Sequence, residues 1–312
     1  MAGADRAPSP DIADLDLAAR ARVAALVEAL PYVQRWAGQT VVVKYGGAAQ
    51  VSPELSQAVM EDVVLLHQVG VHVVLCHGGG PTVSELGRRL GIVPRFVDGL
   101  RVTDDDTMRV AQQVQVGLIS RDIAAAIGRR GGRALGLSGQ DAGGWLRARL
   151  YPYRDRQTGE PVDLGRVGEV TEVRAQVLRD LLRDGLVPVV APIAVDERFD
   201  ALNVNADAVA TAVAGALGAA RLIFLTDVDG IRGPEGAPVP RVTRAQLDLW
   251  IATGVVTGGM IPKATACLEA LSAGVGRVTV ADGRVPHALL LELLTDRGVG
   301  TLVEDAPSEH QP

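Results

Sequence analysis

Two apolar segments, each followed by a glycine turn and a helix signal, most restrict what this chain can fold into. Residues 40–44 lead into Gly46-Gly47, and residues 71–76 lead into His77-Gly78-Gly79-Gly80. Ser52, which directly precedes a proline, is a good N-cap for the first of the two helices. This order predicts parallel βαβ units, in which ligands bind at the carboxyl ends of the strands, where these glycines fall.

The apolar composition favours an α/β fold. Hydrophobic residues make up 47% of the 312 residues but aromatic residues only 3%, so the core consists of small aliphatic side chains. Such side chains are typical of parallel strands that helices cover on both faces. The length allows one large α/β domain or two smaller lobes.

Further elements extend this pattern. Apolar residues recur at helical spacing from about residue 16 to 36, where Pro31 predicts a kinked or broken helix. Alternating stretches at residues 145–153 and 167–173 flank a polar turn and predict an antiparallel hairpin that projects from the main sheet. The remaining segments predict strands at 187–193, 222–226 and 278–281, and helices from 207, at 243–253, at 262–273 and from 286.

The charge balance gives no basic footprint for nucleic acid or for an anionic membrane surface, because 37 acidic residues exceed 31 basic ones. Cys76 and Cys267 both lie in apolar runs, which is typical of buried thiols rather than of a disulfide or metal framework. No apolar run reaches 18 residues, and the first residues lack the layout of a secretion signal. We therefore expect small-molecule chemistry in the cytoplasm.

Lysine is almost absent from the sequence. Two of the 31 basic residues are lysines, Lys44 and Lys263, and the other 29 are arginines. A site that keeps lysine can need a compact ammonium rather than a planar guanidinium. A genome whose codon composition disfavours lysine could leave two lysines by chance. Both lysines lie beside glycine pairs, however, which favours a functional role.

The run His77-Gly78-Gly79-Gly80 offers backbone N–H groups in front of a helix N-terminus, an arrangement that binds phosphate or carboxylate. An esterase oxyanion hole also uses such a run, but it requires a downstream Gly-x-Ser-x-Gly elbow. The nearest candidate, Gly136-Leu137-Ser138-Gly139-Gln140, has glutamine at the last position. Neither a P-loop nor the protein-kinase motifs are present.

Two polar groups complete the candidates. Asn203-Val204-Asn205-Ala206-Asp207 places two amides and a carboxylate in a turn before an alanine-rich helix, although asparagine and aspartate are also ordinary turn residues. Arg101, in Gly-Leu-Arg-Val-Thr-Asp, can clamp a substrate carboxylate with two hydrogen bonds. The histidines show no metal-ligand spacing, and His77 is expected to be structural.

These motifs together resemble those of acetylglutamate kinases, in the same order. The matching segments are Lys44-Tyr45-Gly46-Gly47, the triple-glycine run, Gly99 to Asp104, Gly136 to Gly139, Asn203 to Asp207, Leu225 to Val228, and Gly258-Gly259-Met260-Ile261-Pro262-Lys263. The resemblance covers about residues 30 to 304. It implies the amino acid kinase fold, which is a doubly wound, mostly parallel sheet sandwiched by helices.

The resemblance also implies a division of labour along the chain. Residues 1–37 would form a mobile tail and the N-terminal helix, 38–200 the lobe that binds the acyl amino acid, and 201–312 the lobe that binds nucleotide. Lys44 and Lys263 would stabilise the transition state, with Asp207 orienting both. N-acetylglutamate would contact Gly79, Gly80, Arg101, Asn203 and Asn205, and ATP would contact Gly46, Gly47, Thr226, Asp227, Gly258, Gly259 and Met260.

The implied reaction needs no general base, because a glutamate side chain has a reference pKa of about 4.3 and is already ionised at neutral pH. The difficulty is to bring one anion to another and to spread charge over an in-line transition state. Lysines, backbone N–H groups and Mg²⁺, held mainly by the nucleotide phosphates, would do this; no metal site made by the protein alone is expected.

The chain also departs from the family pattern. Ala48 stands where asparagine or glycine is common, and Gln140 where lysine is common. These departures keep two alternatives open: a catalytically weak arginine sensor, and a kinase for a related acyl amino acid such as N-acetyl-aminoadipate. Substrates that differ by one methylene are separated by only about 1–3 kcal/mol, so sequence alone does not decide between them.

Features at both ends resemble the arginine-inhibited branch of the family. They are the N-terminal helix that runs into Ala29 to Val33, and the segments 287–292 and 298–301. The resemblance implies an arginine site that includes His287, Glu292 and Gly298, and a hexamer built as a trimer of dimers through the N-terminal helix. A dispensable helical extension and an ordinary capped helix would give the same sequence features.

Overall fold

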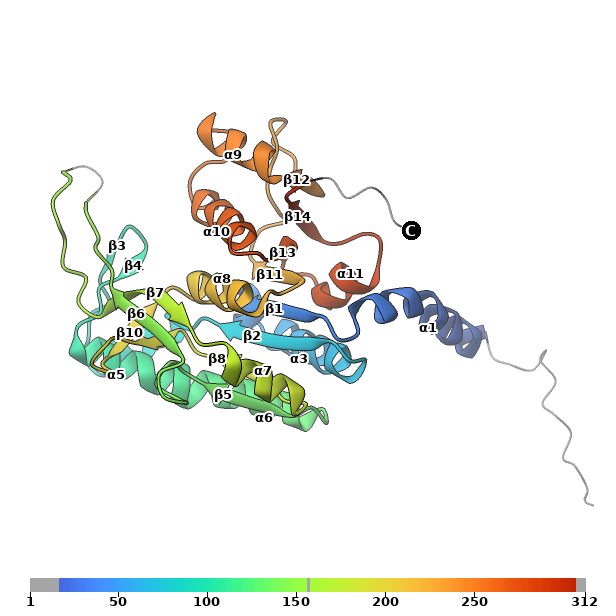
Figure 1. Cartoon of the computed structure of the whole chain (residues 1–312), viewed down its shortest axis with the longest axis horizontal. Coiled ribbons are helices and arrows are strands. Elements are labelled where there is room, and N and C mark those ends of the chain that lie inside the picture. Colours follow the sequence, from blue (N-terminus) through green and yellow to red (C-terminus); the bar gives the residue numbers. More distant parts are fainter. Residues whose placement is uncertain (1–16, 156–157, 307–312) are drawn as a thin grey trace, which may run out of the picture.

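The computed structural model describes residues 17–155 and 158–306, so the mobile tail expected before the N-terminal helix lies outside the described residues. A central eight-stranded sheet has the order β12-β14-β13-β11-β1-β2-β8-β5. Every neighbouring pair is parallel except β13 and β14, which confirms the mostly parallel sheet expected from the sequence. Helices lie on both sides of it (Figure 1).

The main-sheet strands are β1 (Thr40–Tyr45), β2 (His72–His77), β5 (Ala134–Leu137), β8 (Val187–Val190), β11 (Arg221–Thr226), β12 (Arg241–Thr243), β13 (Val278–Asp282) and β14 (Gly300–Glu304). The helices are α1 (Leu17–Trp36), α2 (Ala48–Val51), α3 (Pro53–Gln68), α4 (Gly80–Arg89), α5 (Asp105–Gln112), α6 (Ser120–Arg129), α7 (Gln176–Arg183), α8 (Ala206–Leu217), α9 (Arg244–Ala252), α10 (Met260–Ser272) and α11 (Ala288–Leu294). A π-helical segment, η2 (Gln113–Ile119), joins α5 to α6.

Strand β1 shows why the sheet has a core on each face. Val41 and Val43 belong to one buried cluster, together with side chains of α3 such as Val63. Val42 belongs to the other cluster, together with side chains of α8 such as Val213. Alternate residues of a strand point to opposite faces, so the continuous apolar run predicted a strand that is buried on both sides, and the structure confirms it.

The predicted hairpin is confirmed but is part of a larger unit. Strands β6 (Leu146–Leu150) and β7 (Val167–Val173) pair antiparallel. They close a small barrel with β9 (Ile193–Val195) and β10 (Ala201–Val204), in the order β10-β7-β6-β9. The single strand predicted at 187–193 is wrong, because the chain leaves β8 at Ala191-Pro192 and enters the barrel as β9. The expected lobe boundary after residue 200 stays a prediction; β10, just beyond it, pairs with strands that precede it.

Helix α1 is one helix with Pro31 inside it. Of the kinked or broken helix expected there, the broken form is therefore wrong, and the kink stays a prediction. Proline removes one backbone donor from a helix, and α1 nevertheless continues to Trp36. Trp36 Nε1 donates a hydrogen bond to Leu293 O (2.7 Å), which fastens the end of α1 to α11. In the part of the chain that the structure describes, no helix combines the length and apolarity that a bilayer span needs.

A buried carboxylate joins α3 to α11. Asp62, which is fully buried, accepts hydrogen bonds from His287 Nδ1 (2.6 Å) and from the backbone N–H of Leu289 (3.2 Å). Burial raises the pKa of the Asp62 carboxyl to about 6, although the contact with His287 opposes this rise. The carboxylate thus holds the first turn of α11 against α3 at a cost in desolvation.

We predict that Asp62→Asn changes how stability depends on pH. The pKa of Asp62 in the folded protein, about 6, exceeds its ordinary value of 3.8. The wild-type free energy of unfolding therefore loses the Asp62 contribution as the pH rises from about 4 to about 6, and asparagine cannot ionise. In urea unfolding, the variant should match the wild type near pH 4 and exceed it near pH 7 by at most about 3 kcal/mol. A stability difference that stays constant between pH 4 and pH 7 would contradict the prediction.

Candidate active site

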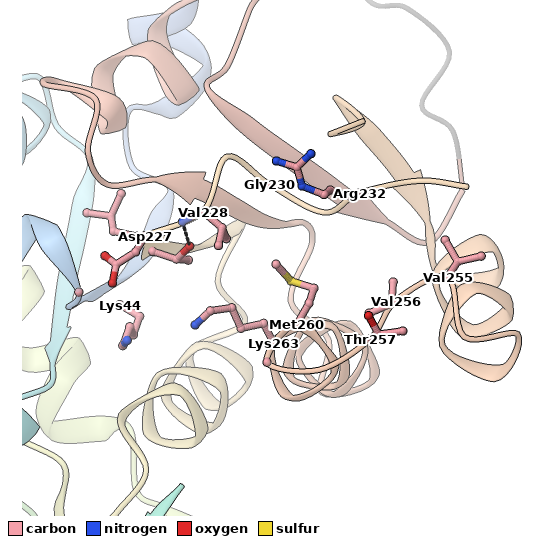
Figure 2. A pocket seen from close by; sticks show the side chains of 14 residues that line it. Lys44, Asp227, Val228, Gly230, Arg232, Val255, Val256, Thr257, Met260 and Lys263 are labelled. Carbon is pink, nitrogen blue, oxygen red and sulfur yellow. Dashed lines mark hydrogen bonds between the residues drawn. The ribbon is translucent and has the colours of Figure 1, made fainter. Parts of the chain in front are cut away.

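A cavity of about 540 Å³ opens beyond the carboxyl ends of β1 and β11. Figure 2 shows side chains from β1, from the loop after β11 and from the start of α10 around one space. The lining residues are Lys44, Gly47, Leu225, Thr226, Asp227, Val228, Gly230, Arg232, Val255, Val256, Thr257, Gly259, Met260 and Lys263. Its place at the carboxyl edge of the sheet is where open α/β folds bind ligands.

Both lysines of the chain meet at one carboxylate. Lys44 Nζ lies 2.9 Å from Asp207 Oδ1, and Lys263 Nζ lies 3.9 Å from Asp207 Oδ2. The closer contact is an ion pair without the angles of a hydrogen bond. The three side chains are between 15% and 27% exposed, so solvent screens their charges only in part. Two ammonium groups from β1 and α10 thus face one cavity, and Asp207 neutralises one of the two positive charges.

The turn before α8 places Asp207. Asn205 is the N-cap of this helix, and its Oδ1 accepts hydrogen bonds from the backbone N–H groups of Asp207 (2.7 Å) and Ala208 (3.4 Å). This cap fixes the first turn of α8, which carries Asp207. The structure therefore gives the Asn205 oxygen a structural task, and its expected contact with substrate stays a prediction.

The residues expected to bind nucleotide lie in or beside the cavity. Gly47, Thr226, Asp227, Gly259 and Met260 line it, whereas Gly46 and Gly258 adjoin lining residues without lining it themselves. Thr226 Oγ1 accepts a hydrogen bond from the backbone N–H of Val228 (3.0 Å), which shapes the loop after β11 (Figure 2).

Glycine is required at position 47. Its φ is +64°, and a Cβ there would overlap the carboxylate of Asp227. A residue with a side chain would be strained at this φ and would also displace Asp227. The loop after β1 can therefore approach the loop after β11 only because residue 47 has no side chain.

A second group of candidates surrounds the triple-glycine turn. Arg101 Nη2 donates hydrogen bonds to Gly80 O (2.8 Å) and Ser84 Oγ (2.8 Å), and its guanidinium lies over the Phe96 ring at 4.7 Å. Burial lowers the pKa of the Arg101 guanidinium, and Arg88 lowers it further. Within residues 17–155 and 158–306, no carboxylate forms an ion pair with Arg101. A partly buried cation of this kind can receive an anionic ligand.

The same region holds Asn203, whose Nδ2 donates to Thr103 Oγ1 (3.2 Å). Thr103 follows Arg101 by two residues, and its Oγ1 also donates to Arg101 O (2.9 Å). These bonds place Asn203 of β10 beside the segment that carries Arg101. The structure therefore brings together, from distant parts of the sequence, most of the residues expected to hold the acyl amino acid.

His77 is structural, as expected. Burial lowers its pKa to about 4, so the imidazole is neutral near pH 7. Its ring nitrogens lie 2.7 Å from Gly78 O and 2.8 Å from Ser120 Oγ, which ties the glycine turn to the end of η2. Gly79 packs against Gln115 and Ile119 of η2, and a Cβ at residue 79 would lie 2.7 Å from Ile119 Cδ1.

The esterase alternative finds no support in the geometry. Ser138 is buried, and its hydroxyl lies 3.1 Å from the carboxylate of Asp141, in the same turn. None of the hydrogen bonds found for Ser138 in the described chain involves a histidine, which a nucleophile elbow requires.

A separate cavity of about 440 Å³ lies between α1 and the end of α11. Glu292 and Gly298 line it, and a Cβ at residue 298 would collide with the Glu292 carboxylate. Burial raises the pKa of Glu292, whose Oε1 accepts a hydrogen bond from the N–H of Val299 (2.7 Å). His287 does not line this cavity, because its ring binds Asp62 instead.

Several lining residues carried too little signal to be selected from the sequence. Arg232 is one of 29 arginines; it lines the first cavity, and its guanidinium pairs with Asp229 (2.9 Å) in the loop after β11. Val255, Val256 and Thr257 form an ordinary apolar stretch in sequence. The glycine pair that follows them was the one local sign that this stretch borders a site.

The comparisons with known proteins agree with this geometry. The family model for the amino acid kinase family matches residues 39–282. Acetylglutamate kinase of Symbiobacterium thermophilum is 52% identical, over 93% of this chain and 99% of that protein. Acetylglutamate kinase of Pelotomaculum thermopropionicum is 46% identical, over 91% of this chain and 98% of that protein.

Solved structures show the same architecture. N-acetylglutamate synthase from Neisseria gonorrhoeae, complexed with coenzyme A and N-acetyl-glutamate, is similar with a TM-score of 0.79 and 27% identity. The similarity covers 91% of this chain and 64% of the synthase chain. Carbamate kinase from Giardia lamblia bound to AMP-PNP has a TM-score of 0.62 at 17% identity, over 86% of this chain and 99% of that chain, which shows a shared fold.

Proposed function

The chain belongs to the amino acid kinase family, and from this premise we propose that it is an acetylglutamate kinase. It transfers the γ-phosphoryl group of ATP to the side-chain carboxylate of N-acetyl-L-glutamate and forms N-acetyl-L-glutamyl 5-phosphate, in arginine biosynthesis. The observation that carries the proposal is the convergence of Lys44 and Lys263 on Asp207 at one cavity.

The proposed step is an in-line displacement. A carboxylate oxygen of the substrate forms a bond to the γ-phosphorus, the bond from that phosphorus to the bridging oxygen breaks, and ADP leaves with the electron pair. The substrate carboxylate is already ionised at neutral pH, so no group has to remove a proton. The enzyme must instead offset the repulsion between two anions and stabilise the charge that spreads over the transferring group.

The two lysines suit this task. Each ammonium is a compact charge with rotatable donors, and together with Asp207 they leave about one net positive charge at the cavity. Asp207 holds both ammonium groups in place before the nucleotide binds, so little reorganisation is needed during the reaction.

Arg101 and the triple-glycine turn would bind the acyl amino acid in the amino-terminal lobe. The Arg101 guanidinium is already held by Gly80 O and Ser84 Oγ, and its remaining donors can take a substrate carboxylate. Asn203 lies beside this arginine through Thr103. We assign residues 38–200 to this task and residues 201–312 to nucleotide binding.

Use of ATP follows from the family, and we propose Mg²⁺ as the accompanying ion. Mg²⁺ in such sites is commonly held by one or two carboxylates together with the substrate phosphates. Among the described residues there is no group of three or more metal-ligating side chains. When bound, Mg²⁺ neutralises phosphate charge.

The alternatives left open by the sequence are not favoured. Gln140, one of the two departures, accepts a hydrogen bond from Gln112 Nε2 (2.7 Å) and lies on the surface. The convergence of Lys44 and Lys263 on Asp207 supports a kinase over a sensor without turnover. A substrate one methylene longer is tested directly by the assay below.

We predict that the purified chain with ATP and Mg²⁺ forms an acyl phosphate from N-acetylglutamate, which hydroxylamine traps as a hydroxamate. Lys44→Arg and Lys263→Arg should each lower kcat by about 100-fold or more, because a guanidinium cannot replace the ammonium as a donor to the transferring group. Arg109→Lys, at an exposed position, is the control for an arginine–lysine exchange. Parallel assays with glutamate and with N-acetyl-aminoadipate define the substrate. Wild-type turnover in both lysine variants would refute the roles assigned to the lysines.

We also propose that the second cavity binds arginine as a feedback inhibitor. Its wall contains Glu292 and five arginines: Arg35, Arg221, Arg241, Arg277 and Arg297. Arg221 is only 6% exposed, and its Nε has no hydrogen-bond partner among the described residues. The guanidinium of a bound arginine would face Glu292, and its carboxylate would face the basic wall. The expected role of His287 in arginine binding stays a prediction. Because its ring contacts Asp62 and does not line the cavity, His287 would act on the site indirectly.

We predict that Glu292→Gln raises the arginine concentration needed for half-inhibition by about 10-fold or more, because the guanidinium loses a charged acceptor. Glu269→Gln, an exposed exchange on α10, is the control and should leave inhibition unchanged. Inhibition curves from the hydroxamate assay measure both. Equal inhibition of the two variants would rule out this cavity as the arginine site.

Copies of the chain are further proposed to associate through α1, as a hexamer in the expected arrangement. Large apolar side chains are exposed along this helix: Leu17, Val23, Leu26, Val27 and Leu30. An exposed apolar stripe of this size favours a protein partner. A location in the cytoplasm stays a prediction.

We predict that Leu26→Glu lowers the mass of the assembly in solution, because a charge would lie within the apolar contact. Light scattering after size exclusion gives that mass as a multiple of the 32.6 kDa chain. Leu249→Glu on α9, where leucine is also exposed, is the matched control. A wild-type chain that elutes as a monomer would overturn the proposal.

A further inference from the structure

The arginine expected to hold the substrate sits on a very small structural element. Arg101 ends β4 (Leu100–Arg101), which pairs with β3 (Phe96–Val97) as a separate two-stranded sheet. Two strands of two residues each do not form a stable hairpin in water by themselves. Other contacts must therefore hold this hairpin over the glycine turn if Arg101 is to keep its position.

One such contact comes from the long connection between β6 and β7. In Figure 1 this connection rises beside β3 and β4. Tyr153, within it, donates a hydrogen bond from its hydroxyl to Asp98 Oδ2 (2.5 Å). Asp98 lies at the tip of the β3–β4 hairpin, where Asp98 and Gly99 both have positive φ, 47° and 81°. The bond thus reaches the end of the hairpin that is farthest from its anchored ends.

Apolar packing and backbone pairing support the same contact. Tyr153, Leu164 and Val167 form a buried cluster, against which Val97, Leu100 and Val102 pack from the hairpin side. The backbone N–H of Thr103 donates to Leu164 O (2.9 Å), and that of Arg166 donates to Thr103 O (2.6 Å). These backbone bonds fix the base of the hairpin, whereas Tyr153 fixes its tip.

We propose that Tyr153 is a positioning residue for the acyl amino acid. Its hydrogen bond to Asp98 holds the β3–β4 hairpin closed over the triple-glycine turn and keeps the Arg101 guanidinium aimed at the substrate carboxylate. This inference rests on the proposed function, because it assumes that Arg101 binds the substrate.

The effect of Tyr153 should fall on one substrate only. None of residues 96–101 lines the cavity that holds Lys44 and Lys263, so loosening the hairpin leaves the nucleotide side intact. If the hairpin spends less time in the binding-competent position, the apparent dissociation constant for N-acetylglutamate equals the intrinsic one divided by the competent fraction, so the apparent affinity falls in proportion to that fraction. The KM for ATP does not depend on the fraction of time that the hairpin is closed.

The experiment compares Tyr153→Phe with Tyr151→Phe in the hydroxamate assay. Both changes remove one hydroxyl from a tyrosine of the same segment, and the two rings stack with centroids 6.3 Å apart. Tyr151 forms no side-chain hydrogen bond within the described residues, so it is the matched control. Tyr153→Phe should raise the KM for N-acetylglutamate by about 5- to 30-fold, because the lost bond is to a charged acceptor. The KM for ATP and the melting temperature should stay close to those of Tyr151→Phe.

A second variant tests the acceptor. Asp98→Asn keeps an oxygen that can accept from Tyr153 and tolerates the positive φ at this position. It should therefore raise the KM for N-acetylglutamate less than Tyr153→Phe does. In the double variant, the rise in KM should be smaller than the product of the two single fold-changes, because Tyr153 and Asp98 share a hydrogen bond.

Different results would refute the proposed function and the positioning role of Tyr153. A wild-type chain that forms no hydroxamate would refute the proposed function itself. An active wild type with equal KM values for N-acetylglutamate in Tyr153→Phe and Tyr151→Phe would overturn the positioning role alone. A fall in melting temperature with both KM values raised together would show that Tyr153 serves only the stability of the fold, which also overturns it.

Discussion

The Asp207 carboxylate, shared by Lys44 and Lys263, is the interaction on which the site depends. The three residues come from β1, α8 and α10, so the carboxylate holds together elements that lie far apart in sequence. Two ammonium groups this close would repel each other without a negative charge between them. Removing the carboxylate would therefore disturb the position of both lysines. The Asn205 cap fixes the turn that carries Asp207.

The two halves of the site use different cations because one is assigned to an anionic group that stays in place and the other to an anionic group that moves. Arg101 faces the place assigned to the substrate carboxylate. Its planar guanidinium is already held by Gly80 O and Ser84 Oγ. A fork of this kind suits a ligand group that stays in one place. The transferring phosphoryl group moves along a line during the reaction, and a rotatable ammonium can follow it. The absence of lysine from all other positions fits this division, since the other 29 basic residues of the chain are arginines.

Sequence alone predicted much of the fold because local patterns specify its central part. The apolar runs at β1, β2, β11 and β13, each bounded by turn residues, were recognised as buried strands, and Ser52 is the N-cap of α3 as expected. The π-helical segment η2 and the barrel made by β6, β7, β9 and β10 were not predicted. Both depend on tertiary contacts, such as the packing of Gly79 on Gln115, that leave no periodic signal in the sequence.

Candidate site residues followed the same rule. Lys44 and Lys263 could be selected because lysine is rare in this chain and both adjoin glycine pairs. Asp207 could be selected because it ends the Asn-Val-Asn-Ala-Asp turn that the family resemblance includes, and the structure brings the three residues together. Tyr153 could not, because one tyrosine in a polar connection carries no signal until Asp98 is found beside it across 55 residues of sequence. A residue that acts through another leaves its trace in the contact and not in the motif. Since the β3–β4 hairpin is too short to hold itself, the position of Arg101 must be supplied by such residues, and motif reading identifies the side chain that binds but not the ones that place it.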